Sequence, residues 1–292
     1  MVAIGEANAL IDTTDPRARS TRPIRPAGSW LVARVRTIAW WRGIVLVLTG
    51  AFFLVPLYAA LRFSLETFSG GFTISAFRVI PSQEGFTAAL NLSIHLAVVT
   101  TLITLGLMVP TSVYVHLRLP RLRRVFDGIT IVPIVIPPVV LIVGVLQVAP
   151  TFLKSTSYLL AFEYAILAMP FVYRSLDAGL RAIDLQTLVE ASRSLGGRWG
   201  STLWRVIVPN LRTGLLSATV LTVALVLGEF TMASLDLYQT VPVWIYNFAQ
   251  DDGHVSTAVS LLALVVTWLV LLAISSFDMR RIRRTAQLRK DA

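Results

Sequence analysis

Long apolar runs dominate the pattern of hydrophobic and polar positions along this chain. They lie at 44–61, 93–115, 129–149, 158–172, 215–235 and 257–277. A helix needs about 20 apolar residues to cross a hydrocarbon core of ~30 Å. Because that core holds no water, backbone polar groups must bond within their own segment. The pattern therefore predicts an all-α polytopic membrane protein with about six transmembrane helices.

The fourth run is the least regular, since it is short and contains Glu163 and Pro170. Prolines also interrupt the second and third runs, at Pro110, Pro133, Pro137 and Pro138. Each proline frees a backbone carbonyl that a neighbouring helix or a cavity must satisfy. Two interpretations stay open, a packing kink and a direct part in gating.

The charge distribution predicts an orientation and argues against nucleic-acid binding. The chain is 55% hydrophobic, 14% charged and carries a net charge of +10. If the N-terminus lies inside, all of the 26 basic residues fall on the cytoplasmic side except Arg62, Arg78 and Lys154. This bias follows the positive-inside rule and predicts that both termini are cytoplasmic.

The same distribution predicts three parts of the chain. Residues 1–43 form a polar, basic cytoplasmic tail that we expect to be largely disordered. Residues 44–278 form the transmembrane domain, and 279–292 form a basic cytoplasmic tail. The first apolar run begins too late and is too long for a cleaved signal peptide, so we expect it to remain.

Metal and disulfide chemistry find no support in the sequence. The chain contains no cysteine, which excludes disulfides and thiolate metal sites. Its histidines, His95, His116 and His254, lack metal-ligand spacing. We expect no metal site, no bound cofactor and no catalytic residue on this chain.

The longest connection, 174–214, predicts a helix–turn–helix on the cytoplasmic side. Asp184 can cap a first helix whose apolar residues recur at helical spacing. Those residues are Leu185, Leu188, Val189 and Leu195. Gly196 and Gly197 can end it, because glycine tolerates the left-handed conformation. Ser201 can cap a second helix that Pro209 closes.

Two roles fit this amphipathic loop, which is too short to be stable without a partner surface. It could lie on the lipid headgroups. Alternatively, it could place its apolar face in a groove of a soluble protein.

A spacing pattern in the loop resembles a known family. Glu190-Ala191-Ser192 is followed after three residues by Gly196, and after nine more by Val206-Ile207-Val208-Pro209. This is similar to the EAA loop of ATP-binding-cassette (ABC) importer permeases, with Ser192 in place of the second alanine. Leu227-Gly228-Glu229-Phe230 resembles the branch with spermidine/putrescine, ferric iron, sulfate and molybdate permeases.

The resemblance implies a permease subunit of an importer in the bacterial inner membrane. In that family, two permeases form the pathway, and we expect a heterodimer here. Glu190, Ala191, Ser192, Gly196 and Pro209 would couple it to ATPase subunits, which bind ATP and Mg²⁺. An extracytoplasmic binding protein would deliver the substrate. The sequence itself lacks the phosphate-binding pattern G-x-x-x-x-G-K-[ST], so this chain is not expected to be an enzyme.

The substrate is less defined, and two buried acids bear on it. Glu163 and Glu229 lie about 7.5 and 9 Å into the outer half of their spans, at 1.5 Å per residue. They could receive a cation, so a polyamine is our first choice, with iron, sulfate, molybdate or phosphonate as other possibilities. Glu229 could instead accept hydrogen bonds that hold adjacent helices. The alternative class is a proton-coupled secondary transporter that uses both acids as relays.

The predicted orientation can be tested by cysteine labelling, since the chain has no cysteine of its own. Cysteines introduced at Ser82 or Gln250 should react with an impermeant maleimide in intact cells. A cysteine at Ser194 should react only after the membrane is opened. The opposite pattern of labelling would overturn the orientation.

Overall fold

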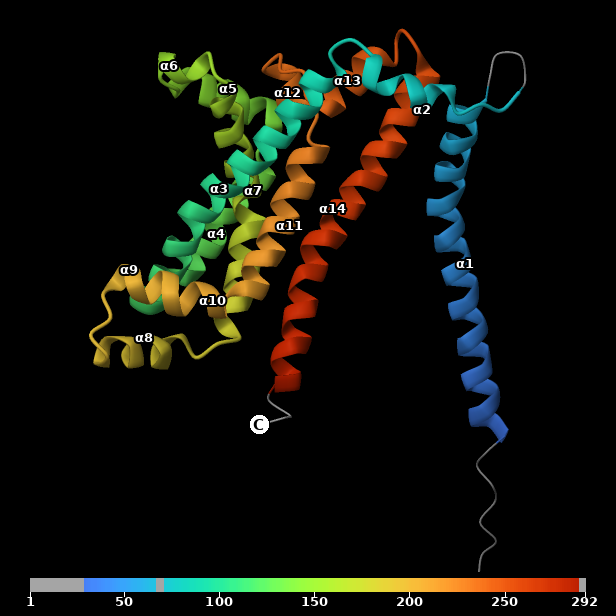
Figure 1. The fold of residues 1–292 in the computed structure, drawn as a ribbon. Coiled ribbons are helices and arrows are strands. Elements are labelled where there is room, and N and C mark those ends of the chain that lie inside the picture. The colour runs from blue at the N-terminus through green and yellow to red at the C-terminus, as the bar shows by residue number, and fades with distance from the viewer. Residues whose placement is uncertain (1–28, 67–70, 289–292) are drawn as a thin grey trace, which may run out of the picture. The chain divides into compact units, whose positions relative to one another are not determined.

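The computed structural model describes the backbone of residues 29–66 and 71–288, and the side chains of 40–66 and 71–276. The chain divides into two units, Met1–Pro56 and Leu57–Ala292, which are described separately. The long helices (Figure 1) are α1 (Ser29–Leu65), α3 (Phe86–Arg118), α4 (Arg123–Val135), α5 (Pro138–Val148), α7 (Ser157–Arg181), α8 (Leu185–Ser194), α11 (Arg212–Gly228), α13 (Val241–Phe248) and α14 (Gly253–Leu288). The short ones are α2 (Ser75–Val79), η1 (Ile80–Ser82), η2 (Pro120–Leu122), α6 (Thr151–Lys154), α9 (Trp199–Thr202), η3 (Leu203–Ile207), α10 (Val208–Asn210) and α12 (Thr231–Leu235).

The all-α prediction is confirmed. The described residues contain no β-strand, and their single isolated bridge joins Glu66 to Phe72. Among the described residues, four helices are long and apolar enough to cross a membrane, and the number rises to six if two bent helix pairs each count as one span. Six apolar runs were predicted. The structure has fewer continuous spanning helices because some of the predicted spans are broken.

Helices α1 and α14 extend beyond the apolar runs that predicted them. Helix α1 begins at Ser29, so residues 29–43, which the sequence assigned to the disordered tail, are helical. Leu31, Val35 and Ile38 recur there at helical spacing. Helix α14 continues to Leu288, into the segment assigned to the basic C-terminal tail. The rest of the predicted N-terminal tail, 1–28, lies outside the described residues.

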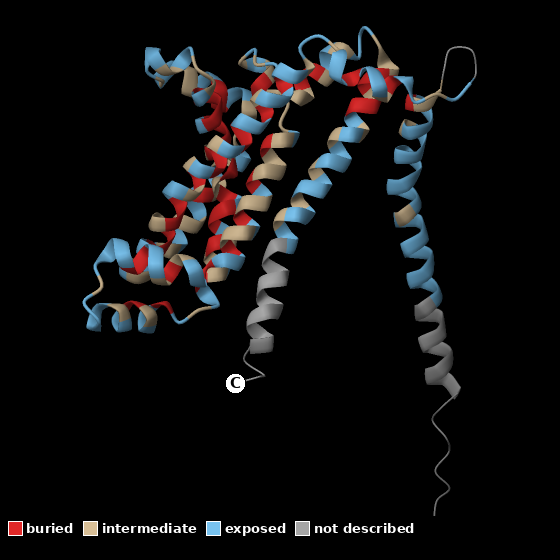
Figure 2. Ribbon diagram, viewed as in Figure 1, coloured by how far each residue is buried: buried red, intermediate tan, exposed pale blue. Residues whose placement is uncertain are grey.

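Helices α3, α7 and α11 pack together to form the core of the second unit (Figure 2). The predicted fourth span is confirmed as α7, which is longer than predicted and runs unbroken through Pro170. It is the most buried span, with 61% of its most apolar window inside the protein. This explains its low hydropathy, because a helix covered by other helices needs fewer lipid-facing apolar residues.

The predicted third span is not a continuous helix. Helices α4 and α5 meet at an angle of 103°. A proline disfavours the helical conformation of the residue before it. Ile136 and Pro137 each precede a proline, and both are extended, with ψ of 125° and 137°. Pro110, Pro133 and Pro170 lie inside continuous helices, so the paired prolines alone produce a break among these positions.

The predicted fifth span also ends early. Helix α11 stops at Gly228, and Glu229 adopts an extended conformation with ψ 124°. The short helix α12 follows, so residues 229–235 do not continue the span.

Two opposite ends of the second unit can be recognised in Figure 1. One end carries α2, α12 and α13 and is called the α13 end below; the other carries α8, α9 and α10 and is called the α8 end. At the α13 end, Trp244 is buried against Ala89 and Val259. Its indole nitrogen donates to the carbonyl oxygen of Glu84 at 3.0 Å. This contact ties α13 to the segment that leads into α3.

Helices α7 and α11 approach each other closely at two glycines. A Cβ added to Gly179 would lie 2.9 Å from a methyl carbon of Leu211 and 3.2 Å from the Cα of Gly214. A Cβ on Gly214 would lie 3.0 Å from the carbonyl oxygen of Ser175. Small residues allow such close backbone contact between membrane helices.

We therefore expect Gly179→Val to separate α7 from α11 and lower the Tm of the detergent-solubilised protein. Overpacking of this kind typically costs about 1–3 kcal/mol. The matched control is Gly144→Ala, because no atom lies within 4 Å of a Cβ at Gly144. An unchanged Tm for Gly179→Val would show that the two helices do not meet at this position.

Candidate functional site

The first helix of the loop, α8, begins where the sequence predicted. The Asp184 carboxylate accepts the backbone amide of Thr187 at 3.2 Å and its hydroxyl at 2.8 Å. These bonds from Thr187 lower the pKa of Asp184 below its ordinary value. They also satisfy an amide that the first turn of a helix leaves unpaired.

The end of α8 is a two-glycine stop with specific geometry. The Gly196 amide donates to the Arg193 carbonyl at 2.9 Å, and the Gly197 amide donates to the Ser192 carbonyl at 2.8 Å. Gly196 has φ of +80°, and a Cβ on Gly197 would lie 2.6 Å from the Ser192 carbonyl oxygen. This pair of bonds is a Schellman motif. Glycine is thus favoured at 196 by its positive φ, and required at 197 by the lack of space for a Cβ.

The second part of the loop differs from the prediction. Its helix begins at Trp199 rather than after Ser201, and Pro209 lies inside α10 instead of closing the helix. It contains a π-helical turn, η3, at Leu203–Ile207. Proline fits here because α10 starts at Val208, and a proline is tolerated in the first turn of a helix.

Ser192, the departure from the family pattern, connects the two parts of the loop. Its hydroxyl lies 2.8 Å from the hydroxyl of Thr202. Thr202 is buried, and its hydroxyl also donates to the Arg198 carbonyl at 3.1 Å. An alanine could not make the first bond. No sequence pattern pointed to Thr202, because its partner Ser192 lies across the turn.

The apolar face of α8 is covered by this chain itself. Leu185 and Val189 are buried in one cluster with Leu180, Leu203 and Ile207. The part of this face formed by Leu185 and Val189 is therefore not free to enter a groove of a partner, and docking of the loop on a partner stays a prediction. The sequence could not reveal that a partner surface was already supplied by the ends of α7 and η3.

The exposed face of the loop carries most of the predicted motif. Glu190, Ala191, Gly196 and Pro209 are exposed, and Ser192 is half-buried. Leu195 was predicted to belong to the apolar face, yet its side chain is 90% exposed. It follows the last turn of α8, where the chain leaves the helix. The structure thus presents the motif residues and an apolar side chain outward.

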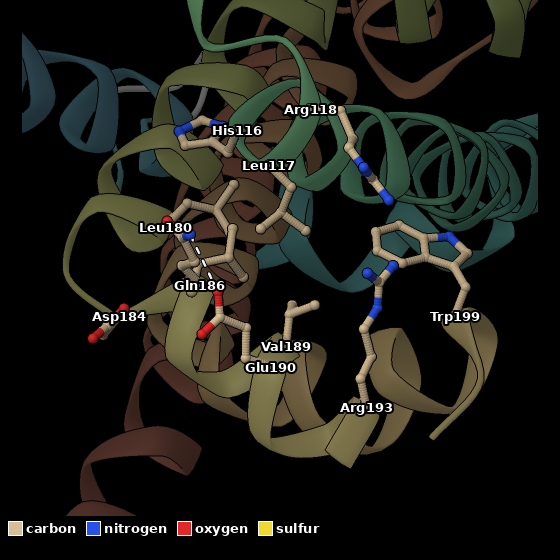
Figure 3. Close-up of a pocket in the computed structure, with 11 residues that line it drawn as sticks. His116, Leu117, Arg118, Leu180, Asp184, Gln186, Val189, Glu190, Arg193 and Trp199 are labelled. Atoms are coloured by element: carbon tan, nitrogen blue, oxygen red, sulfur yellow. Dashed lines mark hydrogen bonds between the residues drawn. The ribbon is translucent and has the colours of Figure 1, made fainter. Parts of the chain in front are cut away.

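A cavity of about 460 Å³ lies between α8 and the end of α3 (Figure 3). Its lining includes Arg118 from α3, Glu190 and Arg193 from α8, and Trp199 from α9. Glu190 accepts a hydrogen bond from the Gln186 side chain at 3.2 Å. The cavity therefore adjoins the predicted coupling residues.

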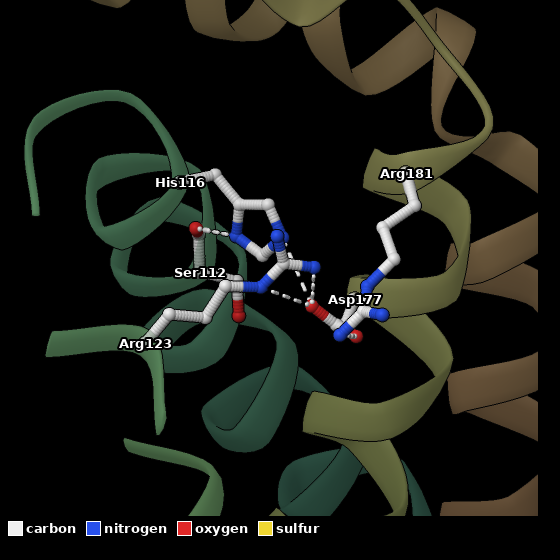
Figure 4. A network of polar contacts seen from close by, with 5 residues as sticks. All are labelled: Ser112, His116, Arg123, Asp177 and Arg181. Carbon is white, nitrogen blue, oxygen red and sulfur yellow. Dashed lines mark hydrogen bonds and ion pairs between the residues drawn. The ribbon is translucent and has the colours of Figure 1, made fainter. Parts of the chain in front are cut away.

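Next to the cavity, which His116 lines, three side chains converge on Asp177 (Figure 4). The Arg123 guanidinium bonds Oδ1, with Nε at 3.0 Å. Arg181 lies 2.7 Å from Oδ2, and His116 Nε2 lies 3.0 Å from Oδ1. His116 Nδ1 donates to the Ser112 carbonyl at 2.8 Å. Asp177 thus joins α3, α4 and α7 at the α8 end, a role that sequence spacing did not reveal.

The predicted acid Glu163 is completely buried near the α13 end. Neither of its carboxylate oxygens has a hydrogen-bond partner in good geometry among the described residues. The charged groups next to it are Asp236 and Glu229, both acids. The sequence singled out the two glutamates but missed Asp236, which lies just past the predicted fifth span. Among the described residues, no group of three such side chains is placed to hold a metal ion.

Glu229 occupies the corner between α11 and α12. Its carboxylate accepts the backbone amide of Met232, at 3.1 Å to Oε1 and 3.0 Å to Oε2, and the Ala233 amide at 3.4 Å. These amides belong to the first turn of α12, where a helix has no acceptors of its own. The observed bonds go to the local backbone rather than to an adjacent long helix.

Long apolar helices around a buried core, with a folded loop at one end, are the architecture of a polytopic membrane protein. Residues 103–285 match the model of the family described as "Binding-protein-dependent transport system inner membrane component". The chain belongs to this family of ABC importer permeases. Its members are multi-pass inner-membrane components of transport systems, not enzymes.

Similar proteins agree with this assignment. The chain is 31% identical to the molybdenum transport system permease protein ModB of Mycobacterium tuberculosis, over 67% of this chain and 80% of ModB. It is 32% identical to the sulfate transport system permease protein CysW of Synechocystis, over 38% of this chain and 44% of CysW. The fold resembles a chain of a bacterial alginate ABC transporter, with a TM-score of 0.68, 13% identity, and coverage of 86% and 97% of the two chains.

The two relatives are described as molybdenum and sulfate transport permeases. Our polyamine expectation rested instead on reading Glu163 and Glu229 as cation ligands. The bonds of Glu229 to backbone amides supply a different use for one of the two acids.

Glu229→Ala should lower the Tm in detergent, because it leaves two amides of α12 without an acceptor. A buried donor without a partner typically costs about 1–3 kcal/mol. Glu229→Gln keeps one acceptor oxygen, so assembly and basal ATPase activity should stay largely intact. We expect uptake to fall. The control is Glu84→Gln, whose side chain is exposed. If Glu229→Ala melts like the wild type, the corner does not depend on this carboxylate.

Proposed function

We propose that this chain forms half of the translocation pathway of an ATP-driven importer for a tetrahedral oxyanion such as molybdate or sulfate. A second, different permease would supply the other half. ATP and Mg²⁺ would bind to partner ATPase subunits, and a binding protein would deliver the anion from outside. The observation that carries the proposal is the folded loop with its motif residues exposed, in a chain similar to oxyanion permeases.

The loop supports mechanical coupling because it is a preformed body. The apolar face of its helix α8 is packed against this chain, and the two ends of α8 are fixed by Asp184 and by Gly196-Gly197. A force on the exposed face would be transmitted to α7 and η3 instead of being lost in a flexible segment. We therefore assign Glu190, Ala191, Gly196 and the exposed Leu195 to the ATPase contact, with Ser192 and Pro209 shaping the loop.

The orientation assigned to the two ends follows from the basic residues. We place the α8 end in the cytoplasm with the ATPase subunits and both termini. The α13 end would then face the binding protein. Helix α14 has only 11% of its most apolar window buried, compared with 44% for α3. Its remaining apolar surface would contact lipid and the second permease.

An oxyanion substrate gives the buried acids a structural role. Glu163 and Asp236 are neighbouring acids, and acids so placed would repel an anion rather than bind it. We therefore propose that Glu229 holds the corner of α11 and α12. Glu163 and Asp236 would hold α7 beside that corner. Membership of the family also argues against the proton-coupled carrier.

Gly196→Asp tests the ATPase contact. No atom of this chain lies within 4 Å of a Cβ at Gly196, and aspartate tolerates positive φ better than most residues. The permease should therefore fold normally, lose uptake, and lose its ATPase subunits during purification. Glu190→Lys should act in the same way by reversing a charge at the contact.

The control for these variants is Gly71→Asp at the α13 end, where a Cβ also meets nothing. It should retain the ATPase. A Gly196→Asp complex that transports normally and keeps its ATPase would refute the coupling assignment.

The substrate is tested separately by ATP-dependent uptake into proteoliposomes that contain the complete importer. Molybdate or sulfate should be transported, and spermidine should not. Uptake of spermidine without either anion would overturn the substrate assignment but leave the coupling assignment intact.

A further inference from the structure

Two arginines at the α8 end point into one cavity without a carboxylate partner. Arg118 is the last residue of α3, and Arg193 lies in the last turn of α8. Both line the cavity of about 460 Å³. Among the described residues, every ion pair involves Asp177, and none includes Arg118 or Arg193. In Figure 3 the two side chains extend toward each other from opposite sides, next to the Trp199 ring.

This arrangement is electrostatically incomplete. Two like charges directed into a shared space repel each other, and long arginine side chains exposed to water are free to turn apart. An anion between them would convert the repulsion into two charge-assisted interactions. The planar guanidinium group matches the oxygens of phosphate-like anions in pairs.

The acids in the same cavity do not fill this role. The Asp184 carboxylate is used as the cap of α8, where it accepts two hydrogen bonds from Thr187. The Glu190 carboxylate accepts the Gln186 amide. In Figure 3 both acids lie on the side of the cavity away from Trp199. The cavity is therefore divided into an acidic side and a basic side, and the basic side lacks a counter-charge.

The position of the cavity at the end of α3 also fits an anion from the membrane surface. Helix α3 has 33 residues, about 50 Å at 1.5 Å per residue. This exceeds the hydrocarbon thickness of ~30 Å, so the helix is long enough to extend beyond the hydrocarbon core, and Arg118 lies at one of its two ends. Trp199 is partly exposed beside it, and tryptophan is enriched at that layer.

We propose that Arg118 and Arg193, beside Trp199, form a binding site for a tetrahedral oxyanion group. The group is either the phosphodiester of an anionic phospholipid or a free inorganic oxyanion. Once bound, it links the end of α3 to α8, two elements that otherwise meet across an open cavity. This consequence for coupling rests on the proposed function, whereas the binding site itself does not.

The site is tested on the full-length permease purified in neutral detergent without ATPase subunits. Sulfate and molybdate are titrated at constant ionic strength with chloride as the reference anion, and binding is measured by calorimetry. In parallel, the protein is placed in nanodiscs of phosphatidylcholine with or without phosphatidylglycerol, and retained lipid is measured by native mass spectrometry. We expect saturable binding in at least one arm.

The variants are Arg118→Gln and Arg193→Gln, with Arg205→Gln as the matched control. Arg205 is an exposed arginine of the same loop that does not line the cavity. Each of the first two changes removes a charge-assisted bond and should weaken binding about tenfold. Arg205→Gln should bind like the wild type.

A second measurement needs no variant and so does not depend on variants that fold. Phenylglyoxal modifies accessible arginines of the wild type, and peptide mass spectrometry locates the products. The bound anion should protect Arg118 and Arg193 but not Arg205. Protection by phosphatidylglycerol alone identifies the lipid as the source, and protection by sulfate or molybdate identifies a free oxyanion.

Three results would overturn the proposal. The first is no saturable binding in any arm. The second is equal protection of all three arginines, which indicates general screening. The third is anion binding unchanged by both substitutions, combined with loss of the ATPase from the assembled complex. That result would assign the arginines to an acidic surface of the ATPase. None of these results concerns uptake, so the proposed function can fail or survive independently.

Discussion

A backbone amide within the membrane layer must find an acceptor inside the protein, and this constraint explains where the helices of this chain can stop. The break between α11 and α12 is stable because the Glu229 carboxylate accepts the amides of Met232 and Ala233. At the break between α4 and α5, Pro137 and Pro138 have no amide to satisfy. The two interruptions thus solve one problem in two ways, with an added acceptor and with removed donors.

Local sequence signals predicted the features whose partners are close along the chain. The apolar runs gave the helices, Asp184 gave the start of α8, and Gly196-Gly197 gave its end, because each bond there spans at most five residues. The motif spacing in the loop led to the family. The paired prolines Pro137 and Pro138 were predicted as bending points. The size of the bend, 103°, depends on how α5 packs against the rest of the protein.

The features that the sequence could not reveal depend on contacts between distant segments. Asp177 gathers His116 and Arg123 from helices more than fifty residues away in sequence. Asp236 lies next to Glu163 although the loop 174–214 separates the two residues in the sequence. The apolar face of α8 looked available to a partner, because nothing in its pattern distinguishes a surface buried by its own chain from one buried by another. The burial of α7, which also depends on distant segments, explains why the fourth span had the weakest apolar pattern of those predicted.

Helix α7 places two buried polar centres on one rigid rod. Glu163 and Asp177 are fourteen residues apart within an unbroken helix, about 21 Å at 1.5 Å per residue. Pro170 lies midway between them, where the missing amide makes bending easier than elsewhere on the helix. If the rod stays straight, a tilt that pulls Asp177 away from Arg123 must swing Glu163 in the same direction and through a larger distance. The helix would then act as a lever with its fulcrum at the contact of Gly179 and Gly214, so small movements beside α8 become larger ones near α13.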